Sequence, residues 1–353
     1  MGWDIGGANT KAAFMRTENG CVEELKTASK YFPVWKDPAK LVNVLSTLKG
    51  KLSGGVEVDG VGVTMTAELS DAYQTKREGV NHVLACAAEA FVGVPVFVLD
   101  VDATLKPIES VKSEPLRIAA ANWAATGWLV SQLIKTCVVV DVGSTSTSII
   151  PVVDGYIVAA GKTDLEKLMN GELVYTGSLR TNVAATVSAV PFRGGEARVS
   201  SELFAQSVDV HLVLGNITEE EYTTETADGR GKTRREALAR LARVVCADVE
   251  MLSEQEIVQI ARYINDRQVE QVAEGLSQVY SRAEMLTAEK IPVVVTGIGR
   301  DFLARVAAEK VCIDKIIDLC KLVQNDLVSV SPAVGVALMA ASKLEGRTVK
   351  WTP

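Results

Sequence analysis

The sequence predicts a two-lobed α/β fold with a cleft between the lobes, and a repeated segment is the main reason. Asp4-Ile5-Gly6-Gly7-Ala8-Asn9-Thr10 recurs 137 positions later as Asp141-Val142-Gly143-Ser144-Thr145-Ser146-Thr147. Strand-forming residues precede each copy, and a hairpin signal follows the next strand, Glu18-Asn19-Gly20 in one copy and Val153-Asp154-Gly155 in the other. The chain has 353 residues, and single hydrophobic cores stop growing at roughly 250–300 residues, so we expect two lobes.

The first lobe is expected over residues 1–130. After the first hairpin, helices and strands alternate in the order helix 38–48, strand 60–66, helix 80–91 and strand 94–99. Glu68 and Asp100 follow two of these strands directly. Because ligands of open α/β sheets bind where strands end, both carboxylates are candidate site residues.

The second lobe is expected over residues 131–330, with an inserted segment at about 160–260. Its expected elements are a strand at 137–141, strands and loops at 171–181 and 199–214, a mobile surface loop at 219–232, a helix at 233–251, a helix after the capping box of Ser253 and Glu256, a strand at 291–296 and a helix at 302–310. An alanine-rich helix at about 331–346 is expected to pack back on the first lobe.

Composition excludes several classes of function. Hydrophobic residues make up 48% of the chain and charged residues 23%, as in ordinary soluble globular proteins. The net charge of −7 argues against nucleic acid or an acidic membrane as the main partner. Six cysteines without a C-x-x-C pair and only two histidines support neither a zinc site nor a disulfide framework. No targeting segment precedes Asp4, and the apolar stretch 118–134 suits a buried helix, so we expect a cytoplasmic protein with no membrane span.

The two repeated loops are the candidate anion-binding elements. Small side chains let backbone N–H groups approach a phosphate closely. The residues expected to bind phosphate are Gly6, Gly7, Ala8, Asn9 and Thr10 in the first copy and Gly143, Ser144, Thr145, Ser146 and Thr147 in the second. Gly297-Ile298-Gly299, between a strand and a helix, is a further phosphate or nucleotide cradle.

The twin Asp-x-Gly-x-x-x-Thr hairpins and the later Thr-Gly-Ile-Gly loop resemble the acetate/sugar kinase, heat-shock chaperone and actin superfamily, whose lobes are ribonuclease H-like. In that superfamily the two hairpins face each other and bind phosphates, and the later glycine loop touches a nucleotide. The resemblance implies that Asp4 and Asp141 hold Mg²⁺, and it implies the actin-like, sugar-kinase-like form of the two-lobed fold.

A narrower resemblance covers residues 2 to about 340. The segments that carry it are Gly2-Trp3-Asp4-Ile5-Gly6-Gly7-Ala8-Asn9-Thr10-Lys11, Val63-Thr64-Met65-Thr66-Ala67-Glu68-Leu69, Ala121-Asn122-Trp123, Val174-Tyr175-Thr176-Gly177, Arg180-Thr181, Ala227-Asp228-Gly229-Arg230 and Arg240-Leu241-Ala242-Arg243. They look like the hydantoinase/oxoprolinase-related proteins linked to tetrahydromethanopterin one-carbon metabolism, a group with members in methanofuran biosynthesis. The resemblance implies a transferase that condenses (aminomethylfuranyl)methyl diphosphate with the phenol of γ-glutamyltyramine and releases diphosphate.

This resemblance assigns roles to single residues. The expected catalytic residues are Asp4, Lys11, Asp141, Glu68 and Asp100. Lys11 would neutralise a phosphate, and Glu68 or Asp100 would act as base toward the phenol, whose pKa is about 10. Thr66 and Arg180 would contact phosphate, or Arg180 the glutamyl carboxylate. Mg²⁺ is the expected cofactor, ATP binding is possible but not required for the reaction, and a diphosphate and a phenolic amine are the expected partners.

Structural alternatives stay open for most of these residues. The two aspartates would then cap turns, Lys11 would be solvated, and Arg180 would form a surface ion pair. Strand-end carboxylates such as Glu68 and Asp100 often only hydrogen-bond a loop, and the glycine pair would form a tight turn. His82 and His211 are expected to be structural or exposed, and Asn122 and Trp123 to belong to the core.

Two other functions also stay open. One is an ATP-dependent small-molecule kinase or a hydantoinase/oxoprolinase-like hydrolase, because one fold supports many activities. The other is a nucleotide-gated binding protein. The sequence does not indicate the oligomeric state.

Overall fold

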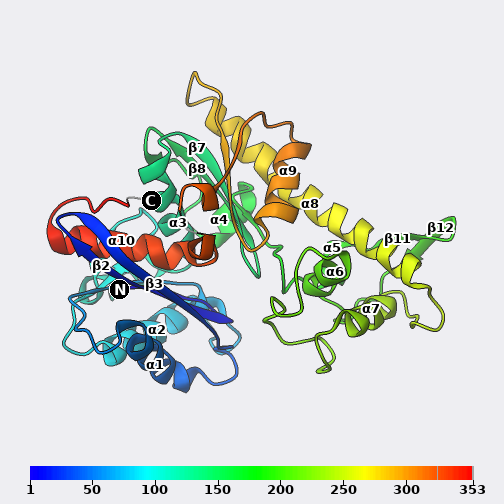
Figure 1. Cartoon of the computed structure of the whole chain (residues 1–353), viewed down its shortest axis with the longest axis horizontal. Helices are drawn as coiled ribbons and strands as arrows, with labels where there is room; N and C mark the ends of the chain where they lie inside the picture. Colours follow the sequence, from blue (N-terminus) through cyan, green and yellow to red (C-terminus); the bar gives the residue numbers. More distant parts are fainter. Residues whose placement is uncertain (324, 352–353) are drawn as a thin grey trace. The chain divides into compact units, whose positions relative to one another are not determined.

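The computed structural model describes residues 1–323 and 325–351, which divide into two compact units (Figure 1). The first unit comprises Met1–Val139, Ile150–Met169 and the described residues from Asp318 onward. The second comprises Val140–Ile149 and Asn170–Ile317. Each unit therefore contains one of the two repeated loops.

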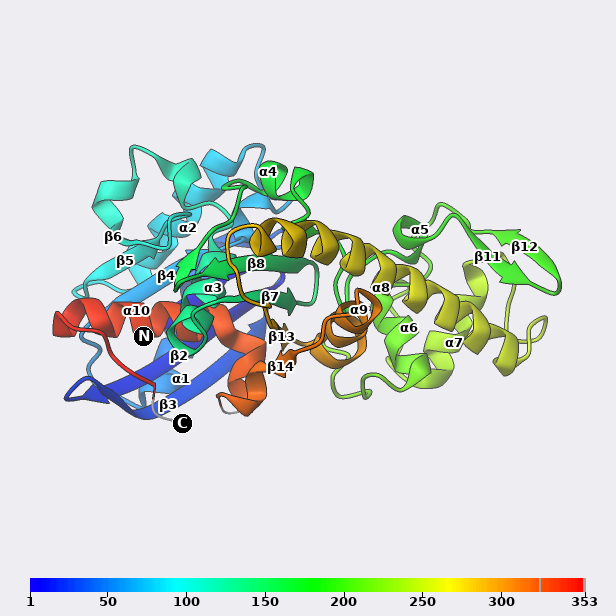
Figure 2. The same cartoon turned by 90° about the horizontal axis from the view of Figure 1, so that it is seen from above.

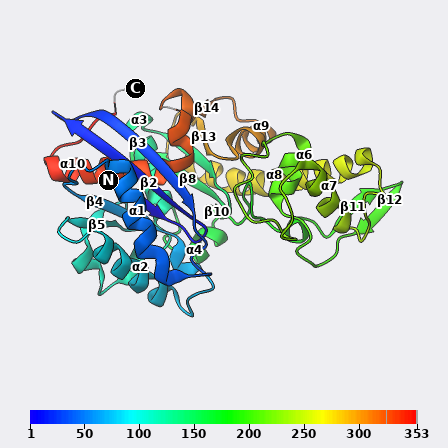
Figure 3. The same cartoon turned by 60° about the horizontal axis from the view of Figure 1, so that its bottom comes forward.

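The first unit is built on a six-stranded sheet in the order β3-β2-β1-β4-β5-β6. Figure 3 labels β2, β3, β4 and β5 of this sheet. Its strands are β1 (Gly2–Ile5), β2 (Asn9–Glu18), β3 (Cys21–Tyr31), β4 (Val61–Met65), β5 (Val96–Leu99) and β6 (Leu105–Pro107). The β1–β2 and β2–β3 pairs are antiparallel, whereas β1–β4 and β4–β5 are parallel. This mixture confirms the predicted hairpin followed by strand–helix–strand connections.

Both predicted hairpin turns are confirmed. Asn19 and Gly20 have φ angles of 54° and 79°, and Glu18 pairs with Cys21 across the two-residue turn. Asp154 and Gly155 have φ angles of 53° and 85° in the turn between β8 and β9. Asparagine, aspartate and glycine tolerate this left-handed backbone, which a two-residue turn needs to match the twist of the strands.

Helices cover both faces of the first sheet. They are α1 (Leu41–Ser53), α2 (Lys76–Ala90) and α10 (Ser331–Glu345); α3 (Asn122–Leu133) packs mainly against α10, and α4 (Asp164–Met169) is a further short helix of this unit. Figure 1 shows α10 on one side of β2 and β3 and the pair α1 and α2 on the other. The core between α1, α2 and the sheet is apolar and includes Trp3 and Ile5, both fully buried. Asn122 and Trp123 are both predicted to belong to the core. Trp123 does, with 3% exposure, whereas Asn122 is only half-buried.

Small residues bring α10 close to the sheet, where it packs against β1, β2, β4 and α3. A Cβ on Gly2 would lie 2.1 Å from the backbone oxygen of Ala333, and one on Gly62 would lie 2.7 Å from that of Val336. The helix backbone thus rests directly on the strands that carry the first loop. The segment Leu327–Glu345 is long and apolar enough to span a membrane by length and composition, but 72% of it is buried in the protein.

The second sheet repeats the strand order of the first. It runs β10-β8-β7-β13-β14, and β9 also pairs with β8. The strands are β7 (Cys137–Val142), β8 (Thr147–Val153), β9 (Tyr156–Ile157), β10 (Leu173–Val174), β13 (Val293–Gly297) and β14 (Ile316–Asp318). The order β8-β7-β13-β14 corresponds to β2-β1-β4-β5, which confirms the duplicated α/β fold. The cleft between the lobes stays a prediction.

A helical region belongs to the second unit (Figure 2). It contains α5 (Val183–Thr186), α6 (Ser207–Leu214), α7 (Arg234–Arg243), the long α8 (Glu254–Glu284) and the hairpin of β11 (Ala189–Phe192) and β12 (Gly195–Arg198). The π-helical turn Arg300–Ala304 and α9 (Arg305–Lys310) follow β13 as the glycine pair predicted. The capping box of Ser253 and Glu256 at the start of α8 is confirmed.

Two expectations for this region are wrong. Residues 207–214 form α6 rather than the expected strand. Because α6 is buried on nearly every side, its sequence lacks the amphipathic period that would have indicated a helix. The helix expected at 233–251 ends at Arg243, and Cys246 has a φ of 56°. The expected surface loop at 219–232 is confirmed as a segment without helix or strand whose residues are mostly exposed, although Tyr222 within it is buried.

Gly62 and Gly50 provide a matched test of the α10 packing. We expect Gly62→Ala to lower the free energy of unfolding by about 1–3 kcal/mol, because its Cβ would overlap α10. Gly50 lies in α1 with no atom within 4 Å of an added Cβ, so Gly50→Ala should raise that free energy by ~0.5–1 kcal/mol. Urea denaturation followed by circular dichroism measures both, and effects of the same sign would contradict the packing.

Candidate active site

The first loop, residues 4–10, is held by four backbone hydrogen bonds, one of which runs from the Phe32 N–H to the Ala8 oxygen at 2.9 Å. The Gly6 N–H donates to the Asn9 oxygen at 3.0 Å and closes the turn between β1 and β2. The Thr66 N–H, just after β4, donates to the Ile5 oxygen at 2.9 Å, and the Val34 N–H donates to the Gly7 oxygen at 2.8 Å.

The second loop, residues 141–147, repeats this arrangement at an offset of 137 positions. The Gly143 N–H donates to the Ser146 oxygen at 3.0 Å, and the Gly299 N–H, after β13, donates to the Val142 oxygen at 3.1 Å. The N–H groups of Leu179 and Arg180 both donate to the Ser144 oxygen at 3.0 Å. The sequence repeat is therefore also a repeat of backbone geometry, as the matching residues predicted.

Three glycines bring backbone segments against the second loop. A Cβ on Gly177 would lie 2.7 Å from the Ser146 nitrogen, and one on Gly299 would lie 2.5 Å from the Val142 side chain. Gly297 has a φ of 87°, and its Cβ would lie 2.3 Å from the Val142 oxygen. The tight turn expected at the glycine pair is present, and it packs directly on the loop.

Side chains complete this neighbourhood in the second unit. The Arg180 guanidinium donates to the Thr145 hydroxyl at 3.2 Å, so Arg180 reaches the loop rather than forming only a surface ion pair. The buried Thr147 hydroxyl donates to the Thr176 oxygen at 2.8 Å. Asp141 is half-buried, and its Oδ1 lies 2.6 Å from where a Gly297 Cβ would be. Loop hydroxyls, a guanidinium and a carboxylate thus converge around one backbone turn, a set of groups suited to an anion and its counter-ion.

In the first unit, Asp4 and Lys11 are directly opposite each other on β1 and β2, and Asp4 is also in register with Thr64 of β4. Side chains directly opposite in a sheet share one face, so these three residues lie together. Asp4 is 5% exposed and Lys11 is half-buried. The Lys11 side chain is therefore only partly solvated. Thr66 lies beside the first loop, with its hydroxyl 3.4 Å from where a Gly6 Cβ would be.

Glu68 is buried in the short 3₁₀ turn Ala67–Leu69 after β4 and is 1% exposed. Neither of its carboxyl oxygens has a hydrogen-bond partner among the described residues. Burial raises the pKa of Glu68 from 4.5 to about 7; the backbone at Glu68 and Ala120 and the charge of Lys76 oppose the rise, and the charge of Asp164 adds to it. A carboxyl that titrates near neutral pH suits a general base.

Asp100 is also buried but is fully engaged. Its Oδ1 accepts hydrogen bonds from the N–H groups of Asp102 and Thr104, each at 3.0 Å, and its Oδ2 pairs with Lys106 at 2.8 Å. These bonds hold the turn between β5 and β6. They favour the structural alternative for Asp100 and leave Glu68 as the stronger candidate base.

Mg²⁺ fits the kinds of atom present around the loops. Within residues 1–323 and 325–351, no three histidine, cysteine, aspartate or glutamate side chains gather to hold a metal. The second loop instead contains the half-buried Asp141 and, three and four positions later, the hydroxyls of Ser144 and Thr145, which lie 3.5 Å apart. Mg²⁺ keeps several of its waters and binds through one or two carboxylates and substrate phosphates, so this set is suitable.

Sequence reasoning missed the support of the second loop by α8. The Gln268 amide donates to the Thr176 hydroxyl and the Gly177 oxygen, both at 2.8 Å, and His211 contacts Gln268 at 3.0 Å. His211 is therefore structural rather than exposed. One signal was available: Gln268 interrupts the apolar row formed by Ile264 and Val272 at helical spacing.

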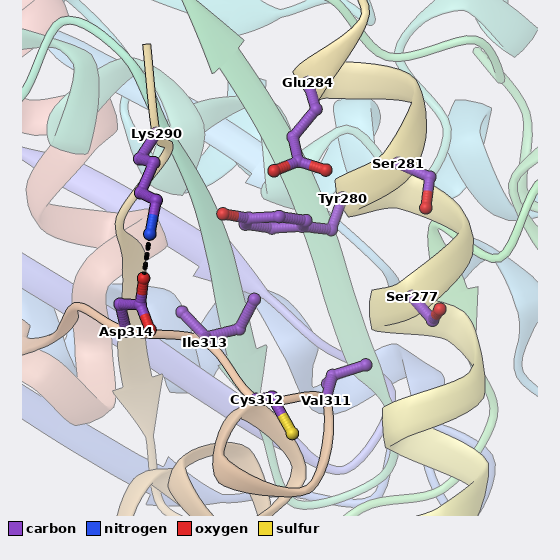
Figure 4. Close-up of a pocket in the computed structure, with 9 residues that line it drawn as sticks. All are labelled: Ser277, Tyr280, Ser281, Glu284, Lys290, Val311, Cys312, Ile313 and Asp314. Carbon is purple, nitrogen blue, oxygen red and sulfur yellow. Dashed lines mark hydrogen bonds and ion pairs between the residues drawn. The ribbon is translucent and has the colours of Figure 1, made fainter.

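A separate hollow of about 360 Å³ lies in the second unit, between the end of α8 and residues 311–314 (Figure 4). Lys290 pairs with Asp314 at its wall, and the Tyr280 hydroxyl donates to the Ile291 oxygen at 2.9 Å. None of the predicted site residues lines it. The repeated loops therefore remain the candidate site.

The fold class of this protein is a duplicated α/β core in which each copy carries one hairpin loop of small residues. The chain belongs to the hydantoinase/oxoprolinase family, whose profile, Hydantoinase/oxoprolinase, matches residues 59–343. A relative from Methanocaldococcus jannaschii, named (4-{4-[2-(gamma-L-glutamylamino)ethyl]phenoxymethyl}furan-2-yl)methanamine synthase, is 37% identical over 346 residues, 98% of each chain. A protein of the same name from Methanococcus vannielii is 35% identical over 215 residues, which are 60% of this chain and 94% of that protein.

Solved structures also resemble the chain. The ethanolamine utilization protein EutJ from Carboxydothermus hydrogenoformans has a TM-score of 0.46 and 15% identity, covering 96% of this chain and 89% of that chain. The ROK hexokinase from Thermus thermophilus has a TM-score of 0.44 and 12% identity, covering 98% of each chain. TM-scores below 0.5 carry no argument about activity, and the fold assignment depends on the strand orders above.

Glu68→Gln tests the raised pKa. Because the folded protein holds this proton up to about pH 7 and the unfolded chain only to about 4.5, wild-type stability should fall as the pH rises through that window. The stability of Glu68→Gln relative to wild type should therefore rise by about 3 kcal/mol between pH 4 and pH 8. Urea denaturation at each pH measures this, with exposed Glu57→Gln as the charge-matched control. A pH-independent difference would show that Glu68 titrates normally.

Proposed function

We propose that this protein condenses (aminomethylfuranyl)methyl diphosphate with the phenol of γ-glutamyltyramine, forming an aryl ether and releasing diphosphate. The observation that carries the proposal is the 37% identity over 98% of both chains with the Methanocaldococcus jannaschii synthase, whose name describes a furanylmethyl aryl ether. The similarity extends over nearly the whole length of both chains.

The reaction is a nucleophilic substitution at the furanylmethyl carbon. The phenol oxygen forms a bond to that carbon, while the bond between the carbon and the diphosphate oxygen breaks and its electron pair leaves with diphosphate. The phenol also gives up its proton. Because the substitution changes no oxidation state and the substrate already carries diphosphate as its leaving group, no oxidant, reductant or nucleotide is needed. Stabilising negative charge on the leaving group and removing one proton are therefore the two tasks of the site.

The second loop supplies the groups for the first task. Its hydroxyls, the N–H groups of a turn built on small residues and the Arg180 guanidinium are held in place by backbone hydrogen bonds before any ligand arrives. Preorganised donors of this kind stabilise developing charge without further reorganisation. The analogous first loop, with Lys11 opposite Asp4, is assigned to a phosphate on the same grounds.

Magnesium belongs to this proposal as the counter-ion of diphosphate, and in each loop the aspartate, Asp4 or Asp141, would hold such an ion through its waters. When bound, it would neutralise part of the phosphate charge. The carboxylates would orient its waters, and the hydroxyls of Ser144 and Thr145 would donate hydrogen bonds to phosphate oxygens.

Glu68 is assigned the second task. A carboxyl whose pKa is raised to about 7 by burial is ionised in part at neutral pH and binds a proton more readily than an exposed glutamate. Asp100 keeps its assignment only as the weaker candidate because the β5–β6 turn uses its oxygens. A cytoplasmic location is part of the same proposal, and the free thiols of all six cysteines suit a reducing compartment.

Product analysis tests the proposal against its rivals. Purified protein with Mg²⁺ and both substrates should form the aryl ether and one diphosphate per ether without ATP. Asp141→Ala should reduce turnover by about 100-fold or more while its circular dichroism spectrum stays unchanged. ATP consumption coupled to phosphorylation or hydrolysis would favour the kinase or hydrolase alternative. Binding of a partner that depends on ATP, without turnover, would favour the nucleotide-gated binding protein.

Arg180→Ala tests the assignment of diphosphate to the second loop. Loss of a charge-assisted hydrogen bond should weaken the binding of inorganic diphosphate by roughly 10- to 100-fold, as isothermal titration calorimetry would measure. Arg198, exposed on β12, provides the control, and Arg198→Ala should bind like wild type. Equal affinities for the two variants would remove Arg180 from the site.

A further inference from the structure

A buried polar network connects α6 and α8 to the second loop, and all of it lies in the second unit. Gln268, on α8, is 1% exposed, and His211, on α6, is 0% exposed. The two Nε2 hydrogens of Gln268 go to the Thr176 hydroxyl and the Gly177 oxygen, both at 2.8 Å. Its Oε1 faces His211 Nε2 at 3.0 Å. Every polar atom of the Gln268 amide is thus used.

These contacts determine the protonation of His211. Both Gln268 hydrogens are already donated, so Oε1 accepts and His211 Nε2 carries the hydrogen. His211 Nδ1 then accepts from the Asn216 amide at 3.2 Å. Burial lowers the pKa of His211 to about 4, so the ring is neutral at physiological pH. A neutral ring with one donor and one acceptor is the form that this network requires.

The turn that Gln268 holds is pressed against the second loop. The space where a Gly177 Cβ would be lies 2.5 Å from the Thr145 carbonyl carbon and 2.7 Å from the Ser146 nitrogen. On the other side, the Thr176 oxygen accepts from the Thr147 hydroxyl at 2.8 Å. A shift of residues 176–177 therefore displaces the backbone of residues 145–147, because no side chain lies between the two segments to absorb it.

We propose that Gln268 is a positioning residue for the anion-binding loop at residues 141–147, and that His211 orients its amide. This inference rests on the proposed function, in which that loop holds diphosphate. Gln268 is not expected to touch the substrate; it keeps the loop N–H and hydroxyl groups aimed at the leaving group. An amide is needed because it donates twice to the turn and accepts once from His211, a combination that neither leucine nor glutamate provides.

Gln268→Leu tests the proposal, with Gln255→Leu as the control because Gln255 is exposed near the start of the same helix. Gln268→Leu should weaken binding of inorganic diphosphate by about tenfold or more, as expected when buried hydrogen bonds are lost, and should lower kcat. The KM for the phenolic substrate should not change. A role only in folding would instead reduce the active fraction and leave both the diphosphate Kd and each KM unchanged.

A second pair of variants keeps the proposal testable if Gln268→Leu does not fold. Gln places its amide nitrogen as many bonds from Cα as His Nε2, whereas Asn places it at the distance of Nδ1. His211→Gln should therefore restore the donor to Gln268 and bind diphosphate more tightly than His211→Asn by about tenfold. Equal affinities in these two folded variants would overturn the orienting role of His211.

Hydrogen exchange in the ligand-free protein separates this inference from the proposed function. Gln268→Leu should speed amide exchange in residues 143–147 relative to Gln255→Leu, whether or not the protein makes the ether. If wild type neither binds diphosphate nor turns over, the proposed function fails, and the exchange data still decide whether Gln268 braces the loop. If wild type is active and Gln268→Leu matches it in exchange, Kd and kcat, the positioning role is excluded.

Discussion

Close backbone packing around the loop at residues 141–147 is the constraint on which the candidate site depends. Two neighbouring segments approach that loop at Gly177 and at the Gly297 and Gly299 turn, where a Cβ would lie within 2.3–2.7 Å of loop atoms. Backbone hydrogen bonds to Val142 and Ser144 then hold the loop without any side chain between the segments. The loop is therefore shaped before a ligand binds, and its N–H and hydroxyl groups are already ordered.

The repeat at 137 positions extends from sequence to hydrogen bonds, yet the two copies differ in what surrounds them. The first loop is flanked by the end of β3 and by Thr66, while the second is flanked by two glycine-rich turns and Arg180. Ser144 and Thr145 replace Gly7 and Ala8, so the second copy adds hydroxyls to the same backbone turn. Duplication thus provides a common scaffold, and local substitutions provide different chemistry on each copy.

Buried polar groups divide into satisfied and unsatisfied ones, and this division separates structural from chemical roles. Gln268 has every polar atom of its amide hydrogen-bonded, whereas Asp100 accepts two hydrogen bonds at Oδ1 and forms an ion pair with Lys106 at Oδ2; each residue holds a turn in position. Glu68 has neither oxygen hydrogen-bonded, and its pKa is raised to about 7. Leaving a carboxyl buried without partners is unfavourable for stability, and such groups are found where titration near neutral pH is useful.

The sequence by itself determined the hairpin turns, the repeated loops, most strands and the capping box, because each depends on residues within a few positions of one another. It also placed the loop residues, Glu68 and Arg180 among the candidates. The sequence-based prediction failed at α6, because burial on nearly every side leaves no amphipathic period in its sequence. It also failed at the end of α7, where the helix stops at Arg243 and the left-handed Cys246 follows. Only the tertiary structure decided that Asp100 is held by hydrogen bonds and an ion pair while the carboxyl of Glu68 is buried without a hydrogen bond. It alone also decided that Gln268 hydrogen-bonds Gly177 from 91 positions away. These outcomes depend on the exclusion of solvent and on contacts between distant segments.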